Sequence, residues 1–194
     1  MFRYASDQSL FLDRAPGDTN LEALARIPGV VNLHPAYQST LIVFDPLVTT
    51  HEAVQLLAEE ATSSMAAPHS RHEIPIHYDG PDLEGVARLH GLPAENVIAL
   101  HAGAEYRVAF LGFVPGFAYL AGLPAALHTP RLATPRKVVP AGSLGIAGDQ
   151  TGVYPLSTPG GWQLIGRTTV ELFNAVNTPM SLLQPGDLVR FVPV

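Results

Sequence analysis

The stretch that decides the fold opens with Gly112-Phe113-Val114-Pro115-Gly116-Phe117-Ala118-Tyr119-Leu120 and closes with Thr158-Pro159-Gly160-Gly161-Trp162-Gln163-Leu164-Ile165-Gly166-Arg167-Thr168. Between Gly112 and Gly166 lie ten of the seventeen glycines and seven of the eighteen prolines of the chain. Glycine allows positive φ and close backbone approach, and proline fixes φ and removes an N–H donor. The stretch therefore predicts short strands joined by shaped turns, and such turns are where ligands usually bind.

Charge sets this stretch apart from the rest of the chain. Residues 102–170 carry a formal charge of +3, whereas residues 1–101 carry −8 and the whole chain carries −6. The positive segment indicates an anionic ligand, because arginine presents a planar fork of donors that fits a carboxylate or a phosphate.

The candidates for binding that anion are three arginines and a pair of glycines: Arg131, Arg136, Arg167, Gly160 and Gly161. The two glycines could turn bare backbone N–H groups toward the anion. The alternative is that the arginines hold loops together through buried carbonyls or Asp149, and that the paired glycines only form a turn beside a core tryptophan.

Composition excludes several classes of protein. With 47% apolar and 14% charged residues, the 194-residue chain can build one large domain or two small ones. It has no apolar run near the roughly 20 residues that span a bilayer and no leader-like start, so a cytoplasmic protein without membrane contact is expected. Because cysteine is absent, disulfides and thiol chemistry are excluded, and the acidic balance argues against nucleic acid as a partner.

Residues 1–78 predict alternating strands and helices. Strand-like runs at Ser9–Asp13, Val30–Leu33, Ser39–Phe44 and Glu73–Tyr78 alternate with helical periods after Leu21 and after Thr49. The order strand, helix, strand, strand, helix, strand is that of a ferredoxin-like α/β sandwich. The small and polar residues from Ala61 to Ser70 predict a flexible joint.

Residues 79–194 predict a β-rich second domain, so that the whole chain is of the α+β class. Two short helices, Asp82 to His90 and Ala94 to His101, precede it, and Asp82 can cap the first. From Glu105 onward the pattern is strand-like, which by periodicity alone predicts a β-barrel or a sandwich.

The glycine-rich runs resemble the signature of one family. They are similar to those of the family that contains the B subunit of bacterial 5-oxoprolinase, subunit 1 of allophanate hydrolase and the KipI inhibitor of a sporulation histidine kinase. Besides the two runs quoted above, the resemblance includes Pro130-Arg131 with Pro135-Arg136, Val139-Pro140-Ala141-Gly142-Ser143 and Gly148-Asp149-Gln150-Thr151-Gly152-Val153-Tyr154-Pro155. It departs at Thr158, Thr169 and Asn174, where Ser, Pro and Asp are expected. The resemblance implies that the second domain is a cyclophilin-like barrel.

The resemblance also implies a function. The expected function is the B subunit of an ATP-dependent 5-oxoprolinase, which opens the lactam 5-oxo-L-proline to L-glutamate together with 5-oxoprolinase subunits A and C. The chain has no Gly-x4-Gly-Lys-Ser/Thr loop, so ATP is expected mainly on a partner. The alternatives are an inhibitor of a sensor histidine kinase, and an accessory subunit of a urea carboxylase or allophanate hydrolase system. A complete catalytic set is not evident, so the isolated chain is expected to be inactive.

Three residues are candidates for catalysis. Gln150 and Tyr154 offer neutral donors and acceptors that suit a lactam, and a histidine matching His101 belongs to the family pattern. The alternatives are turn residues at the first two positions and, at the third, a histidine stabilised by a helix C-terminus. His69, His72 and His77 have loose metal-like spacing but lack a fourth ligand, so no metal is predicted.

A partner interface is expected on the first glycine-rich run. Its candidates are Phe113, Phe117, Tyr119 and Leu120, because an exposed apolar surface would suit a partner such as the C subunit. The alternative is that these four side chains pack in the core.

Overall fold

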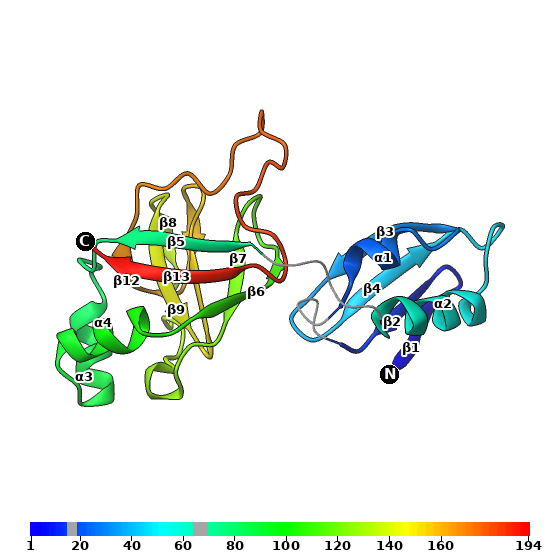
Figure 1. Ribbon diagram of the computed structural model, residues 1–194. Helices are drawn as coiled ribbons and strands as arrows, with labels where there is room; N and C mark the ends of the chain where they lie inside the picture. Colours follow the sequence, from blue (N-terminus) through cyan, green and yellow to red (C-terminus); the bar gives the residue numbers. More distant parts are fainter. Residues whose placement is uncertain (15–18, 64–69) are drawn as a thin grey trace. The chain divides into compact units, whose positions relative to one another are not determined.

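The computed structural model describes residues 1–14, 19–63 and 70–194, which divide between two compact units, Met1–His69 and Ser70–Val194 (Figure 1). The predicted joint, Ala61 to Ser70, lies for the most part on residues 64–69, outside the described residues. Within the described part of the chain, no helix is both long enough and apolar enough to cross a bilayer.

The first unit is a four-stranded antiparallel sheet with two helices. Its strands run in the order β1-β2-β4-β3. The elements are β1 (Phe2–Ser6), β2 (Ser9–Leu12), α1 (Leu21–Ala25), β3 (Val30–Pro35), β4 (Thr40–Phe44) and α2 (His51–Ser63). Alternate residues of β2 and β4 are buried against one face of each helix, and the resulting core includes Leu10, Leu24, Ile42, Phe44 and Val54.

The predicted ferredoxin-like sandwich is not confirmed. The run Glu73–Tyr78 supplies no strand to this sheet, and β1 is an additional strand that pairs with β2 as a hairpin. The unit therefore has the order strand, strand, helix, strand, strand, helix. The alternating pattern of 73–78 identifies a strand correctly, but a period of two does not say which sheet the strand joins.

The second unit is a nearly closed barrel with helices at one side. Its elements are β5 (Arg71–Ile76), α3 (Leu83–His90), α4 (Ala94–Ala102), β6 (Tyr106–Leu111), β7 (Ala118–Ala121), η2 (Ala125–Leu127), β8 (Arg136–Val139), β9 (Ser143–Ala147), β10 (Gln150–Val153), β11 (Thr158–Gly160), β12 (Gln163–Arg167) and β13 (Leu188–Pro193). The predicted helices at 82–90 and 94–101 are confirmed as α3 and α4, which pack against β12 and β13 respectively (Figure 1).

Seven strands form one mixed sheet in the order β12-β9-β10-β7-β6-β13-β5. Its two edges are joined where His77 and Arg167 exchange backbone hydrogen bonds of 2.9 and 2.8 Å, so the sheet nearly closes on itself. The expected α+β class with a β-rich second half is confirmed, while the narrower cyclophilin-like assignment stays a prediction. The predicted boundary after residue 78 falls nine residues later than the end of the first unit, because β5 pairs in parallel with β13.

A smaller two-stranded sheet, β11 with β8, lies outside the barrel sheet. Together with the turn between β6 and β7 it encloses a separate aromatic cluster: Phe117, Val139, Ala147, Tyr154, Trp162 and Leu164. The glycine-rich stretch therefore builds this corner of the second unit as well as four strands of the barrel sheet, β7, β9, β10 and β12.

Candidate binding pocket

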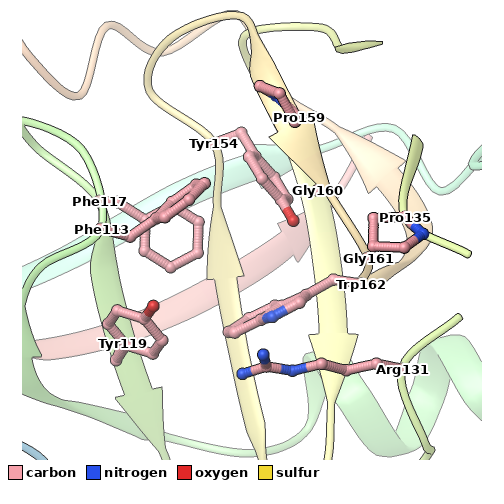
Figure 2. Close-up of a pocket in the computed structure, with 10 residues that line it drawn as sticks. All are labelled: Phe113, Phe117, Tyr119, Arg131, Pro135, Tyr154, Pro159, Gly160, Gly161 and Trp162. Carbon is pink, nitrogen blue, oxygen red and sulfur yellow. The ribbon is translucent and has the colours of Figure 1, made fainter. Parts of the chain in front are cut away.

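The aromatic cluster borders a cavity of about 280 Å³ (Figure 2). Its residues come from the turn between β6 and β7, from β7, from the loop before β8, from the position after β10, and from β11 with the two residues that follow it, all within the stretch 113–162. The lining residues are Phe113, Phe117, Tyr119, Arg131, Pro135, Tyr154, Pro159, Gly160, Gly161 and Trp162.

Phe117 is the centre of the pocket wall. Its side chain is 1% exposed, and its ring meets those of Tyr119, Tyr154 and Trp162 at centroid distances of 4.9, 5.1 and 5.3 Å. All three contacts are edge-to-face, the arrangement that the quadrupoles of aromatic rings favour. These contacts fix the ring orientations, so the pocket is formed before any ligand arrives.

Phe113 forms the rim of the pocket and has an unusual backbone. Its φ is +68°, in the left-handed region that L-residues seldom adopt, and its side chain is 59% exposed. The turn is held by backbone hydrogen bonds from Gly112 to the Phe117 carbonyl, 3.1 Å, and from Phe117 to the Val114 carbonyl, 3.1 Å. Strained residues that are held in place by their surroundings are frequent at ligand sites.

Two phenols lie in the pocket wall, on Tyr119 and Tyr154. Burial raises the pKa of both above the ordinary value for tyrosine, and the nearby Arg131 charge acts in the opposite direction on each. A backbone hydrogen bond with Trp162 also lowers the pKa of Tyr154. Because burial is the larger effect, both phenols stay protonated near neutral pH and can donate hydrogen bonds.

Arg131 is the basic residue of the pocket lining. Its side chain reaches from the loop before β8 alongside the Trp162 ring, with the guanidinium toward Tyr119 (Figure 2). No carboxylate forms a salt bridge with it in residues 1–14, 19–63 and 70–194. None of the described residues that line the cavity is acidic, so the positive charge of Arg131 faces the cavity uncompensated.

Arg136 has a different environment from the one expected for an anion site. One of its amino groups, Nη2, donates to both Asp82 carboxylate oxygens, at 2.6 and 2.8 Å, and Nη1 donates to the Trp162 carbonyl at 3.3 Å. The Leu164 amide donates to the same carboxylate at 2.6 Å. Asp82 makes no side-chain cap to α3, so the predicted capping role is replaced by this brace.

Arg167 lies outside the pocket lining as well. It pairs with Asp79 at 2.8 Å, and both side chains are about half or more exposed. The expected convergence of three arginines is therefore corrected to one pocket arginine and two ion pairs. Their partners Asp79 and Asp82 lie before the positive segment 102–170, so a charge count confined to that segment omits them.

Gly160 and Gly161 both line the pocket, and at Gly160 the reason for glycine is steric. A Cβ at Gly160 would collide with the Tyr154 hydroxyl, whereas a Cβ at Gly161 would make ordinary contact with Pro135 at 3.6 Å. The Gly161 carbonyl accepts a hydrogen bond of 2.8 Å from the Leu132 amide, which ties the loop before β8 to the pocket.

The three candidate catalytic residues are not brought together. Tyr154 lines the pocket, Gln150 lies in β10 paired with Ala121 and Ala147, and His101 is completely buried at the end of α4. The His101 Nε2 lies 2.9 Å from the Thr151 hydroxyl and its Nδ1 lies 2.8 Å from the Tyr78 hydroxyl. A ring with both nitrogens engaged and no exposed surface cannot reach a substrate, so the expected catalytic role of His101 is corrected to a structural one.

The four residues expected at a partner interface differ in their exposure. Phe117 and Leu120 are each 1% exposed and belong to cores within the second unit, so they offer no surface to a partner. Tyr119 is partly buried in the pocket wall, and Phe113 alone of the four is exposed. The inward position of Phe117 follows from Gly116, whose φ of +80° turns the chain back toward the barrel.

Metal ligands do not cluster in the described part of the chain, where no group of three or more His, Asp or Glu side chains could hold an ion. His72 bonds to Asp187 at 2.9 Å, and His69 lies outside the described residues. Pro135 and Pro159, which belong to the family-like runs but are not among the predicted site residues, complete the pocket.

Comparison with known proteins places the chain beside a defined set of relatives. The model of the carboxyltransferase domain, subdomain C and D, matches residues 18–183. The B subunit of 5-oxoprolinase from Escherichia coli O157:H7 is 50% identical over 178 residues, which cover 89% of this chain and 82% of that protein. The B subunit of 5-oxoprolinase from Bacillus subtilis (strain 168) is 42% identical over 184 residues, covering 86% and 77%. The crystal structure of TTHA0988 has a TM-score of 0.82 at 36% identity and covers 100% of this chain, which spans 40% of that longer chain.

Proposed function

This chain belongs to the family of the carboxyltransferase domain, subdomain C and D, together with the B subunits of 5-oxoprolinase, and on that premise we propose that it is the B subunit of a 5-oxoprolinase. In the proposed reaction 5-oxo-L-proline is opened to L-glutamate at the expense of ATP. The observation that carries the proposal is the identity with known 5-oxoprolinase B subunits, which extends over most of both chains.

The geometry of the pocket supports a binding role rather than an autonomous catalytic one. The described lining offers aromatic walls, two phenols and one arginine, but no histidine or carboxylate that could act as a general base. A lactam is a stable amide, and opening it requires an activated nucleophile in addition to a bound substrate. We therefore infer that partner subunits, of the A and C type, supply the remaining groups.

The pocket offers few groups that could hold ATP. A triphosphate requires several cationic or backbone donors, whereas the lining has one arginine and a cavity of about 280 Å³. The sequence also has no phosphate-binding loop of the Gly-x4-Gly-Lys-Ser/Thr type. The proposal therefore assigns ATP to a partner, and this chain holds and orients the organic substrate.

The test is reconstitution. The purified chain is mixed with subunits A and C, ATP and 5-oxo-L-proline, and L-glutamate is measured; each mixture lacking one component is the control. Glutamate is expected only from the complete mixture. Absence of glutamate from the complete mixture would overturn the assignment, and glutamate from this chain alone would overturn its dependence on partners.

A further inference from the structure

We propose that the aromatic pocket binds the substrate of the complex, a small planar ring that carries one carboxylate, with the guanidinium of Arg131 on the carboxylate and the Tyr119 hydroxyl on the ring carbonyl. The proposal rests on the proposed function, because that function makes 5-oxo-L-proline the ring in question. It assigns the recognition of this substrate to the described pocket of this chain alone.

The size of the cavity selects a single small ring. An engineered cavity of about 150 Å³ holds benzene, and pockets for drug-sized ligands begin near 300 Å³. The present cavity of about 280 Å³ therefore accommodates one ring with its substituents. A nucleotide, with two ring systems and a phosphate chain, exceeds that volume.

The walls suit the carbon skeleton of such a ring. The rings of Phe117 and Trp162 are 1% and 4% exposed, and both line the cavity (Figure 2). The methylene carbons of a lactam ring would lose contact with water against this aromatic wall, and burial of apolar carbon is favourable. The edge-to-face contact of 5.3 Å between the two rings holds the wall in place without a ligand.

The charge of the pocket selects one carboxylate. Arg131 lines the cavity with no acid among the described lining residues, whereas Arg136 and Arg167 are each paired with an aspartate. A guanidinium can donate two parallel hydrogen bonds to one carboxylate. A single uncompensated cation matches a singly charged ligand, which excludes phosphate esters of higher charge as the preferred occupant.

The donor for the lactam carbonyl is the Tyr119 hydroxyl, on the side of the pocket toward which the Arg131 guanidinium extends (Figure 2). The hydroxyl points toward the other aromatic rings of the pocket, and burial keeps it protonated by raising its pKa. It can therefore donate to the lactam carbonyl. Tyr154 is less available, because its hydroxyl packs against Gly160 and takes a backbone hydrogen bond with Trp162.

The chain contains one tryptophan, Trp162, so its fluorescence reports directly on the pocket. We expect the purified chain to show a saturable change in tryptophan emission when titrated with 5-oxo-L-proline. The same titration with 2-pyrrolidinone, which has the lactam ring but lacks the carboxylate, is expected to require at least about tenfold higher concentration, since a charge-assisted contact is lost.

Two variants separate the proposed contact from general effects of charge. Arg131→Gln should weaken binding of 5-oxo-L-proline by about tenfold or more and leave binding of 2-pyrrolidinone unchanged. Arg190→Gln removes an equal charge from an exposed position on β13 outside the lining and should leave both unchanged. Tyr119→Phe should weaken both ligands, because both carry the lactam carbonyl. Melting temperatures of all three variants check that folding is retained.

The outcomes distinguish this proposal from the proposed function. If the reconstituted complex makes glutamate but wild-type chain gives no saturable signal, or if Arg131→Gln and Arg190→Gln complexes have the same KM for 5-oxo-L-proline, the pocket assignment is overturned and the function stands. If the chain binds 5-oxo-L-proline in the predicted pattern but the complete mixture makes no glutamate, the pocket stands and the function falls.

Discussion

His101 illustrates how a residue can belong to a family pattern for structural reasons. Its imidazole is stacked on Phe191 at 5.0 Å and hydrogen-bonded on both sides. The Thr151 hydroxyl donates its proton to the Gly145 carbonyl at 3.0 Å, so it must accept from Nε2–H of the histidine. Nδ1 is then the acceptor for the Tyr78 hydroxyl. The network thus specifies one neutral tautomer and links α4, β10 and the chain after β5.

The buried imidazole predicts a dependence of stability on pH. Burial lowers the pKa of His101 from 6.5 to about 3. Between these values the unfolded chain binds a proton that the folded chain does not, so stability falls as the pH falls from about 6.5 toward 3. We expect His101 to account for a loss of about 2 kcal/mol between pH 7.5 and pH 5, measured by urea unfolding. The matched variant His101→Gln, which cannot titrate, should lose correspondingly less over the same range; parallel pH profiles would contradict the assignment.

The two pocket glycines, Gly160 and Gly161, are predicted to differ in how much stability is lost when each is replaced by alanine. Gly160→Ala places a Cβ against the Tyr154 ring and should cost about 1 to 3 kcal/mol of stability, the usual range for overpacking. Gly161→Ala meets only Pro135 at ordinary distance and should stay within about 0.5 kcal/mol of wild type. Thermal unfolding measures both. If the two substitutions changed stability equally, the close approach of Gly160 to Tyr154 would not be what excludes a side chain at position 160.

Among the elements, β12 is positioned by an ion pair that comes from the start of α3. Asp82 holds Arg136 and the Leu164 amide, and Arg136 in turn holds the Trp162 carbonyl. The pair is largely buried, with side-chain exposures of 27% for Arg136 and 15% for Asp82. This brace therefore connects a helix, the small sheet and the strand that follows the pocket tryptophan.

Removal of one partner of this brace is predicted to disturb the pocket. Arg136→Ala leaves the largely buried Asp82 carboxylate without its ion-pair partner, which should cost about 2 to 4 kcal/mol in urea unfolding. It should also shift the emission maximum of Trp162 in the folded state, because the carbonyl of that residue loses its donor. The control is Arg167→Ala, which breaks an exposed pair and should leave both quantities close to wild type. If the Arg136→Ala protein were destabilised but its tryptophan emission were unchanged, the ion pair would stabilise the fold without shaping the pocket.

The elements differ in how well the sequence predicts them. The helices α3 and α4 are predicted closely because nearby residues carry the signals for them. The apolar residues repeat with a helical period, and Gly91, with φ +65°, ends α3. β1 escapes prediction because four of its five residues are exposed, so its alternation carries no apolar signal. The pairing of β5 with β13 joins residues more than a hundred positions apart, and no local pattern encodes it.

At the scale of the whole molecule, the sequence predicts the location of the pocket but not its chemistry. The density of glycine, proline and aromatic residues locates it, because shaped turns and packed rings are properties of adjacent residues. The environment of each arginine depends on Asp79 and Asp82, which reach the barrel from outside the glycine-rich stretch. Burial likewise decides which of the aromatic residues could face a partner, and burial is a property of the complete fold.

The position of β5 makes a final prediction about which part of the chain folds by itself. β5 pairs along its whole length with β13, and it buries Ile74 and Ile76. Loss of a buried isoleucine side chain lowers the free energy of unfolding by about 2 to 5 kcal/mol. Net stabilities of domains are about 5 to 15 kcal/mol, so a fragment of residues 79–194 should unfold at much lower urea concentration than one of residues 70–194, or should fail to fold. Fragment 70–194 keeps the hydrogen bond of 2.9 Å from the Leu188 amide to the Ser70 carbonyl and should unfold cooperatively. Equal unfolding midpoints for the two fragments would mean that β5 is dispensable to the barrel, and the boundary after residue 78 would then be the correct one.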